Sequence, residues 1–398
     1  MASKKVNLVN SMGYGKTWQL WIAGGLMASA GSLYAWSAMI PAIRESYSAT
    51  TEQAGMVFSS AILAFTIAVI LVPRAGRRLQ GLRGGGIIGA AGSVFLGLSA
   101  VSPNYSVFVV SFGLGFGAAS GGIYIVVLDI AGRAQRPILF VPVMVAAFGL
   151  GSALFGPLLR LLVGAGGGLA SLSAVAAPLV CASALALALE KRAVAEIQRT
   201  EAEPRGMKIA DRHRVLLLWL IFCLGSMAGL MTLGLASSIV EVRGASVLLS
   251  SATLAGIAVG NTAGRLAVGF LAQWMLPQNI LAGAAPIIAL GIAVAWHSSI
   301  PAIVGAGLVL IASGYGLVAS GIPALTREMF GSARFGRVFS LIFSAWGVAG
   351  LTAPWLAGWI FDQWGDYRFA FFLALGATVL ASVLSLALVR IQRRRRMS

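Results

Sequence analysis

Residues 247–272 read VLLSSATLAGIAVGNTAGRLAVGFLA and carry a single charged side chain, Arg265. A run of this length and character is long enough to cross the hydrocarbon core of a membrane as one helix. An arginine in the middle of such a helix costs roughly 3 kcal/mol to insert, so its side chain has to face a protein interior or a wet cavity. Because the segment contains no acidic residue, we expect a site there that attracts an anion.

The rest of the chain has the same apolar character. Of its 398 residues, 58% are hydrophobic and only 10% are charged, and the mean hydropathy is +0.89. Soluble domains do not combine these values, whereas helical membrane proteins do. Runs of about 20 apolar residues predict an all-α membrane protein with twelve transmembrane helices. The predicted spans are 18–43, 53–73, 84–101, 106–131, 137–161, 169–189, 215–241, 247–272, 278–297, 301–326, 337–361 and 368–390.

The basic residues indicate how the chain is oriented. The formal net charge is +17, which could also serve nucleic acid binding, but its distribution favours a role in topology. When both termini are placed in the cytoplasm, the basic residues between spans lie inside, except Arg44, Arg160, Arg243 and Arg368. This asymmetry follows the positive-inside rule. We therefore expect a multi-pass protein of the cell inner membrane, with arginines 393–396 near anionic lipid and no nucleic acid partner.

The residues that usually carry enzyme chemistry are scarce. Cys181 and Cys223 lie inside apolar spans and lack metal-ligand spacing. The two histidines, His213 and His297, lie in a polar linker and at a span end. No nucleophile–base pair is found in the spans, so we expect neither an enzyme nor a metal or other cofactor.

A polar segment at 190–214 divides the chain. It predicts an N-terminal six-helix bundle at 1–189, a cytoplasmic linker and a C-terminal six-helix bundle at 215–398. Any two bundles need a linker, but this layout is typical of rocker-type transporters. The fifth and eleventh spans each carry a stripe of small residues that ends in proline, at 149–157 and 347–354. Such stripes permit close helix approach and bending.

Several motifs resemble one family of membrane proteins. Span one carries GSLYAWS at 31–37, followed by Pro41, and span eight carries NTAGR at 261–265. Further matching stretches lie in spans seven and ten to twelve, at 218–234, Pro323, Phe330, Gly331, 346–350 and 358–367. Together these residues resemble the major facilitator superfamily. The match is to its oxalate/formate antiporter-like branch, which is related to the monocarboxylate transporters, and it implies the fold of two six-helix bundles.

Two loops depart from the family pattern. Residues 73–78 (PRAGRR) resemble the Asp-Arg-x-Gly-Arg signature, with Pro73 in the place of Asp. In the second half, Gln273 stands where Asp is usual. The usual loop salt bridges, and the gating latch that they form, are therefore not expected here in the same form.

The resemblance implies a role for Arg265, because the span-eight arginine of the family binds the substrate carboxylate. A guanidinium is a planar fork that matches a carboxylate with two parallel hydrogen bonds. The alternative is an arginine held by backbone carbonyls or a helix C-terminus to brace the two halves. Asn261 stands one turn earlier on the same face. Animal monocarboxylate transporters carry an Asp there that is implicated in proton coupling, and Asn cannot titrate.

Aromatic residues from several spans are expected to wall the same site, although helix packing explains each one equally well. Tyrosine supplies an apolar body and one hydrogen bond, which suits a lactate-like hydroxyl. Oxalate-type members carry a second cation, a lysine in span eleven, where Trp346 stands here. A second carboxylate would be buried unpaired, which predicts a monoanion. The expected wall residues are Tyr34, Tyr124, Tyr315, Phe343 and Trp346.

These features predict a secondary active transporter of small monocarboxylates such as lactate or pyruvate. It would act as a monomer by alternating access, with the proton carried at the substrate–Arg265 site, because Asp129 beside Arg133 is read as a structural pair. Anion exchange without protons remains open. Two further alternatives are a transporter of a larger hydrophobic solute, such as a drug or siderophore, and a membrane sensor or scaffold that moves nothing.

Overall fold

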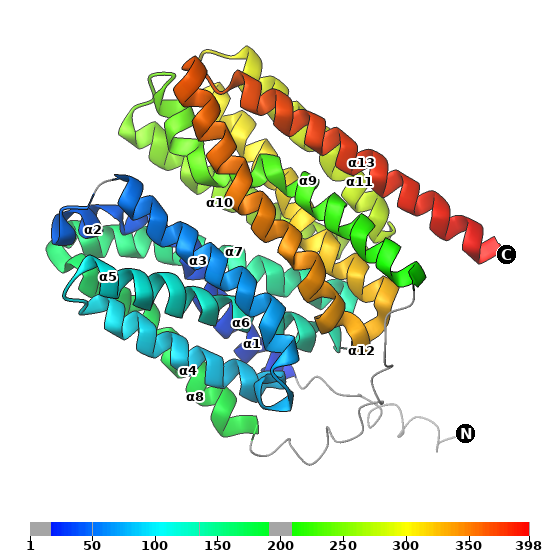
Figure 1. Ribbon diagram of the computed structural model, residues 1–398, viewed down its shortest axis with the longest axis horizontal. Helices are drawn as coiled ribbons and strands as arrows, with labels where there is room; N and C mark the ends of the chain where they lie inside the picture. The colour runs from blue at the N-terminus through cyan, green and yellow to red at the C-terminus, as the bar shows by residue number, and fades with distance from the viewer. Residues whose placement is uncertain (1–16, 50, 135, 191–208, 398) are drawn as a thin grey trace, which may run out of the picture.

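The computed structural model describes residues 17–49, 51–134, 136–190 and 209–397, and every regular element within them is a helix. Figure 1 shows the helices gathered into two bundles that lie side by side. The first contains α1 (Thr17–Gly31), α2 (Ile40–Tyr47), α3 (Thr51–Leu71), α4 (Gly81–Ala100), α5 (Tyr105–Phe108), α6 (Gly117–Gly132), α7 (Pro137–Leu162) and α8 (Ser173–Glu190). The second contains α9 (Ile209–Glu241), α10 (Val247–Leu271), α11 (Pro277–His297), α12 (Pro301–Trp364) and α13 (Arg368–Met397).

The number of membrane crossings follows from the lengths of the helical runs and from the positions where they are broken. Within the described ranges, nine helical runs are long and apolar enough to cross a membrane, or ten if the bent pair at the start of the chain is one span. Two of the runs, Leu139–Leu189 and Pro301–Trp364, cover 51 and 64 residues, whereas about 20 suffice for one crossing. They are broken at Gly166 (φ 85°) and Gly331 (φ 73°), in a left-handed conformation that interrupts a helix. Each run therefore holds two crossings, which agrees with the twelve predicted spans.

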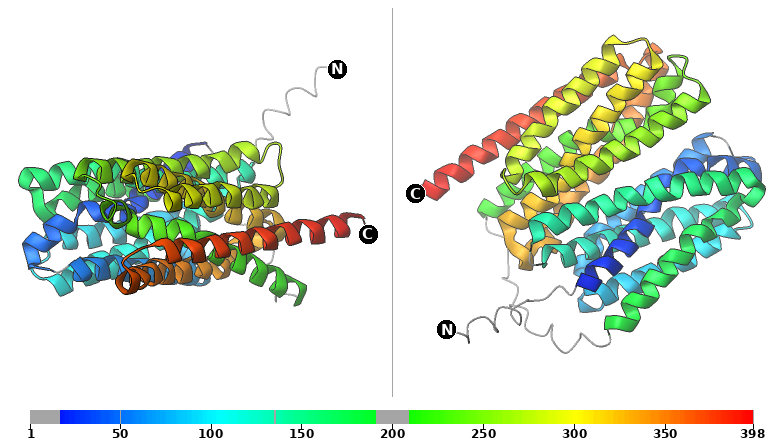
Figure 2. Two further views of the ribbon diagram at one scale, coloured as in Figure 1. Left: turned by 90° about the horizontal axis from the view of Figure 1, so that it is seen from above. Right: turned by 180° about the vertical axis from the view of Figure 1, so that it is seen from behind.

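The ends of the bundles fix a direction. The described chain enters α1 and α9, and leaves α8 and α13, at one end of the molecule, which we name the linker end (Figures 1 and 2). Most of the predicted linker at 190–214 lies outside the described residues, and α9 already begins at Ile209. The break at Gly331 turns α12 back at the linker end, so residues 332–364 run away from it (Figure 1).

Glycines set the closest crossings inside the first bundle. A Cβ added at Gly31 of α1 would lie 1.8 Å from the carbonyl oxygen of Phe148 in α7. A Cβ at Gly121 of α6 would lie 2.2 Å from the carbonyl oxygen of Phe65 in α3. Helices in a membrane associate through van der Waals packing, which small residues make possible by letting the backbones touch. These contacts bring Phe65 and Phe148 toward the centre of the molecule.

One glycine of each small-residue stripe lies where the bundles touch, whereas Gly151 of the first stripe packs against Ala28 of α1 within its own bundle. A Cβ at Gly149 of α7 would lie 3.1 Å from Oγ1 of Thr262 in α10. A Cβ at Gly347, in the second half of α12, would lie 2.5 Å from Cγ2 of Thr66 in α3. The close approach expected from these stripes is therefore observed, and the approaches at Gly149 and Gly347 are contacts between one bundle and the other.

Candidate functional site

Arg265 points from the second bundle into the contact with the first. Glycines at 256, 260 and 264 lie at every fourth position of α10, and this face packs on α12. At Gly264 an added Cβ would lie 2.0 Å from the carbonyl oxygen of Ser313. The next residue is turned by about 100° around the helix, so Arg265 leaves that face and meets α7. It lies in the last third of α10, nearer the linker end than the central position predicted from the sequence.

The guanidinium is held by neutral acceptors. Its Nε donates to Oδ1 of Asn261 at 3.0 Å, and its Nη1 donates to the backbone oxygen of Val145 in α7 at 2.7 Å. Arg265 is only 2% exposed and forms no ion pair with any residue that the structure describes. The predicted proximity of Asn261 is confirmed. The bond to Val145 also matches the alternative expectation of an arginine held by a backbone carbonyl.

Aromatic side chains from both bundles surround this cation. Tyr34 belongs to the 3-10 helix η1 (Ser32–Ala38) that follows α1, and its ring lies 5.1 Å from that of Phe148 and 6.4 Å from that of Trp346. The ring centre of Tyr124 in α6 lies 5.3 Å from that of Phe343. The hydroxyl groups of the three tyrosines predicted for the site, including Tyr315, lie close enough to interact electrostatically with Arg265.

Within this cage, one hydrogen bond joins the part of α12 before the break at Gly331 to the part after it. Nε1 of Trp346 donates to the hydroxyl of Tyr315 at 2.6 Å, and both side chains are buried. Tyr315 reaches this position because Gly229 of α9 leaves room for it: an added Cβ would lie 2.2 Å from its Cγ. The indole and the phenol are therefore held in fixed relative positions.

These side chains close around a very small cavity of about 10 Å³, which is about the room that one water molecule needs. Its wall consists of Tyr34, Phe65, Tyr124, Phe148, Phe222, Arg265, Tyr315, Ala319, Phe343 and Trp346. Eight of these ten residues are aromatic. Tyr34 alone among the aromatic wall residues is partly exposed rather than buried, so it marks the edge of the cage.

All seven residues predicted for the site meet here. Six of them line the cavity, and Asn261 is bonded to Arg265. Sequence reasoning missed Phe65, Phe148, Phe222 and the backbone oxygen of Val145. The three phenylalanines look like ordinary apolar positions of their spans, and a backbone acceptor leaves no trace in a sequence. The glycines that face Phe148 and Phe65 were the available signal.

Charged groups also lie near the bundle contact at both ends of the molecule: away from the linker end, Nη1 of Arg160 in α7 donates to Oγ of Ser251 in α10 at 2.9 Å, and the others lie at the linker end. Arg133 binds Asp129 with Nε–Oδ2 and Nη2–Oδ1 distances of 3.0 and 3.2 Å, which confirms the predicted structural pair. Arg327 of α12 donates from Nε to the carbonyl oxygen of Gly132, the last residue of α6. A helix ends with unsatisfied carbonyls and partial negative charge, so a cation there is favourable. This contact joins the two bundles, and the Asp129 carboxylate lies close enough to interact electrostatically with Arg327.

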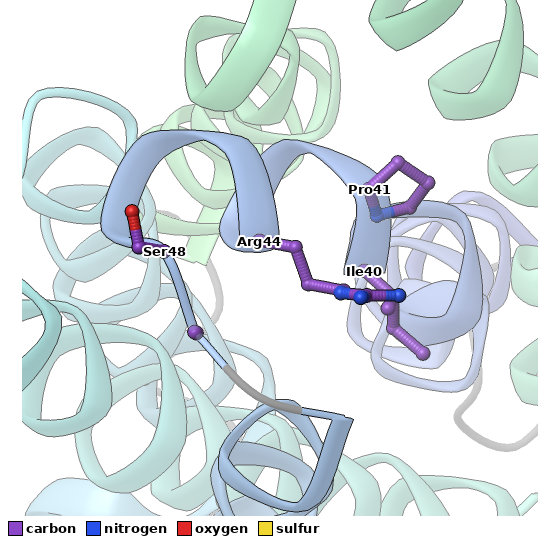
Figure 3. Close-up of a pocket in the computed structure, with 5 residues that line it drawn as sticks. Ile40, Pro41, Arg44 and Ser48 are labelled. Carbon is purple, nitrogen blue, oxygen red and sulfur yellow. The ribbon is translucent and has the colours of Figure 1, made fainter.

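A wider pocket of about 450 Å³ lies at α2, away from the linker end. It is lined by Ile40, Pro41, Arg44, Ser48 and Ala49 (Figure 3), and it shares no residue with the aromatic cage. In Figure 3 the side chain of Arg44 extends along the helix toward Ile40. The only charged residue that lines this pocket is Arg44, which is exposed at the surface. The aromatic cage around Arg265 is therefore the stronger candidate site.

Two helical bundles that enclose one small central site define a multi-pass membrane transporter. Residues 20–350 match the family model described as Major Facilitator Superfamily, and the chain belongs to this family. Proteins of this family and fold are transporters and not enzymes.

Two solved structures share the fold. One is the Major Facilitator Superfamily transporter FucP in the outward conformation, with a TM-score of 0.69 and 15% identity over 92% of this chain and 98% of that chain. The other is the proton:xylose symporter XylE bound to 6-bromo-6-deoxy-D-glucose, with a TM-score of 0.75 and 15% identity over 94% of this chain and 96% of that chain. No curated protein sequence matches the chain. Identity this low relates the folds and does not transfer a substrate.

Proposed function

We propose that this protein transports small monocarboxylates, of lactate or pyruvate type, across the cell inner membrane by alternating access. Arg265 binds the carboxylate, and the aromatic cage encloses the rest of the solute. The linker end faces the cytoplasm, as the basic residues of the loops indicate. Proton symport is the preferred coupling, with anion exchange as the alternative.

The observation that carries this proposal is a buried cation that only neutral groups hold. Arg265 keeps its positive charge at every physiological pH, and neither Asn261 nor the Val145 carbonyl cancels that charge. A carboxylate can do so with two charge-assisted hydrogen bonds. The three tyrosine hydroxyls around Arg265 offer partners for a hydroxyl or keto oxygen beside the carboxylate.

The same cage favours a solute with one charge. Arg265 is the only cationic residue among the ten that line the cavity. A second carboxylate would be enclosed by aromatic rings without a cation, which is costly. A larger hydrophobic solute is the second candidate, because eight aromatic rings offer it a suitable surface.

The test is uptake of radiolabelled L-lactate, pyruvate, formate and oxalate into proteoliposomes, with and without an inward proton gradient. We expect saturable monocarboxylate uptake that falls at least about 100-fold in Arg265→Ala, since the charged pair is worth several kcal/mol in a closed site. Arg265→Lys should lose uptake as well, because an ammonium cannot form the planar fork. Arg44→Ala, which removes an exposed arginine, is the matched control and should transport normally.

Normal uptake by Arg265→Ala would show that Arg265 only braces the bundles. If none of the four anions moves, hydrophobic solutes become the leading candidates. The response to the proton gradient separates symport from exchange.

A further inference from the structure

The bond between Arg265 and Val145 joins the two bundles at the candidate site itself. Nη1 of Arg265, on α10, donates to the backbone oxygen of Val145, on α7, at 2.7 Å. The Asn261 and Val145 acceptors are both neutral, and the Val145 bond, like the contact of Arg265 with the Tyr34 hydroxyl, comes from the opposite bundle. This bond requires the bundles to be closed on each other along α7 and α10.

A glycine lets α7 and α10 come close beside this bond. Gly149 lies one turn after Val145 in α7, and an added Cβ would lie 3.6 Å from both Cδ and Nε of Arg265 and 3.1 Å from Oγ1 of Thr262. A methyl group at 149 would make ordinary contact with the arginine but would press on Thr262 of α10, so that α7 and α10 would have to move apart by a few tenths of an ångström. With glycine there, the guanidinium passes close to the backbone of α7.

In the closed arrangement, Nε and Nη1 of Arg265 are both bonded to protein atoms. The cavity beside it has a volume of about 10 Å³, which leaves no room for a carboxylate. Removing a guanidinium from water is costly unless hydrogen bonds replace the lost hydration. The Val145 carbonyl supplies such a bond to Nη1, a nitrogen that a carboxylate could also use.

We infer that the Val145 carbonyl is an internal ligand that competes with the substrate carboxylate for Arg265 and lets the bundles close without cargo. The inference rests on the proposed function. If the empty protein can close, it can also reorient across the membrane without a solute, and the result is net transport. An obligatory exchanger closes only around a solute and therefore only exchanges one solute for another. Gly149 is the positioning residue of this device.

The experiment compares two fluxes of radiolabelled L-lactate from proteoliposomes of the full chain, at clamped membrane potential. In zero-trans efflux the outside solution contains no lactate, and in exchange it contains unlabelled lactate at the internal concentration. For the wild type, we expect a zero-trans rate within about tenfold of the exchange rate. Exchange without measurable zero-trans efflux would overturn the inference and leave the proposed function intact. No flux in either assay would overturn both.

Variants at the internal ligand sharpen the test. Gly149→Ala should lower the ratio of zero-trans to exchange rate at least about threefold, because the new methyl group presses on Thr262, moves α7 and α10 apart and so weakens the Arg265–Val145 bond. Thr262→Ala in the same chain should restore the ratio, since it removes the oxygen that the methyl group meets. Gly156→Ala is the matched control in the same helix: its Cβ would meet only Ala35, at 3.8 Å. An unchanged ratio in Gly149→Ala, with exchange intact, would show that the bond plays no part in closing.

Discussion

Two tryptophans near the bundle contact each have one hydrogen bond that fixes the position of the indole ring. The indole of Trp346 has one N–H, and its partner is the hydroxyl of Tyr315 at 2.6 Å. A second tryptophan, Trp219, makes a comparable bond of 2.8 Å to Oγ of Ser344, outside the cavity wall. The two bonds are alike in chemistry and differ in their distance from Arg265. Loss of the Trp346–Tyr315 bond should therefore affect substrate binding, whereas loss of the Trp219–Ser344 bond should affect only stability.

At this scale we predict that Tyr315→Phe raises the KM for the transported carboxylate about tenfold. The loss of the hydroxyl leaves the buried Trp346 N–H without a partner, at a cost of about 1–3 kcal/mol, and removes a polar group beside Arg265. Ser344→Ala, which leaves Trp219 unpaired, should lower the midpoint of thermal unfolding while KM stays unchanged. Uptake kinetics and melting curves of both variants check this. Equal KM values for the two variants would assign Tyr315 to folding alone.

Elements meet in this protein through glycine crossings, because lipid offers no hydrophobic drive for helices to associate. The crossing of α1 and α7 is the tightest one near the site. It brings Gly31 against the backbone of Phe148, whose ring belongs to the cavity wall. The same crossing places Tyr34 and Phe148 at a ring distance of 5.1 Å. The geometry of the cage is thus inherited from a contact between two backbones.

Gly31→Ala is expected to destabilise the protein in detergent by at least about 1–3 kcal/mol, the usual cost of overpacking. The added methyl group would lie 1.8 Å from the Phe148 carbonyl oxygen, so α1 and α7 have to separate. Gly97→Ala is the control, since its Cβ meets nothing within 4 Å. Thermal unfolding followed by tryptophan fluorescence measures both. A Gly31→Ala variant as stable as the control would contradict the tight crossing.

For the whole molecule, a contact of Arg327 at the linker end joins the two bundles where the family resemblance predicts a different latch. Pro73 and Gln273 stand where acids are usual, and the bundles are joined instead by Arg327 and the C-terminal carbonyl of α6 at Gly132. Phe335 packs against the same glycine, since an added Cβ at Gly132 would lie 3.3 Å from its Cδ1. A cation at a helix C-terminus gains from the helix dipole. At this end Arg327 therefore meets both a backbone oxygen and the nearby Asp129 carboxylate of the first bundle.

We predict that Arg327→Ala shifts the population toward a conformation open at the linker end. The readout is the rate at which a maleimide labels Ala131→Cys, a fully buried position beside Gly132, in a chain with Cys181→Ser and Cys223→Ser. The rate should rise several-fold in Arg327→Ala. Arg44→Ala is the control, because Arg44 is an exposed arginine at α2, away from the linker end, and it should label at the wild-type rate. Equal rates would show that other contacts hold this end closed.

Local patterns by themselves determined the class of this protein. Hydropathy over about 20 residues marks a membrane span without reference to any other span, and an unpaired arginine in such a span already indicates an anion site. The pairing of Arg265 with Asn261 also follows from sequence, because residues four apart share a helix face. The division into domains at 189 and 215 and the carboxylate role of the site residues remain predictions.

Only the tertiary structure decided what closes the site. The Val145 carbonyl, Phe65 and Phe148 reach Arg265 and its cage from the first bundle, across more than a hundred residues of chain. Their positions depend on where helices cross and on which glycines let backbones touch. Such contacts join segments far apart in sequence. Every residue has a backbone oxygen, so residue type does not reveal which one accepts a hydrogen bond. Helix periodicity describes one element at a time, and this site is built between elements.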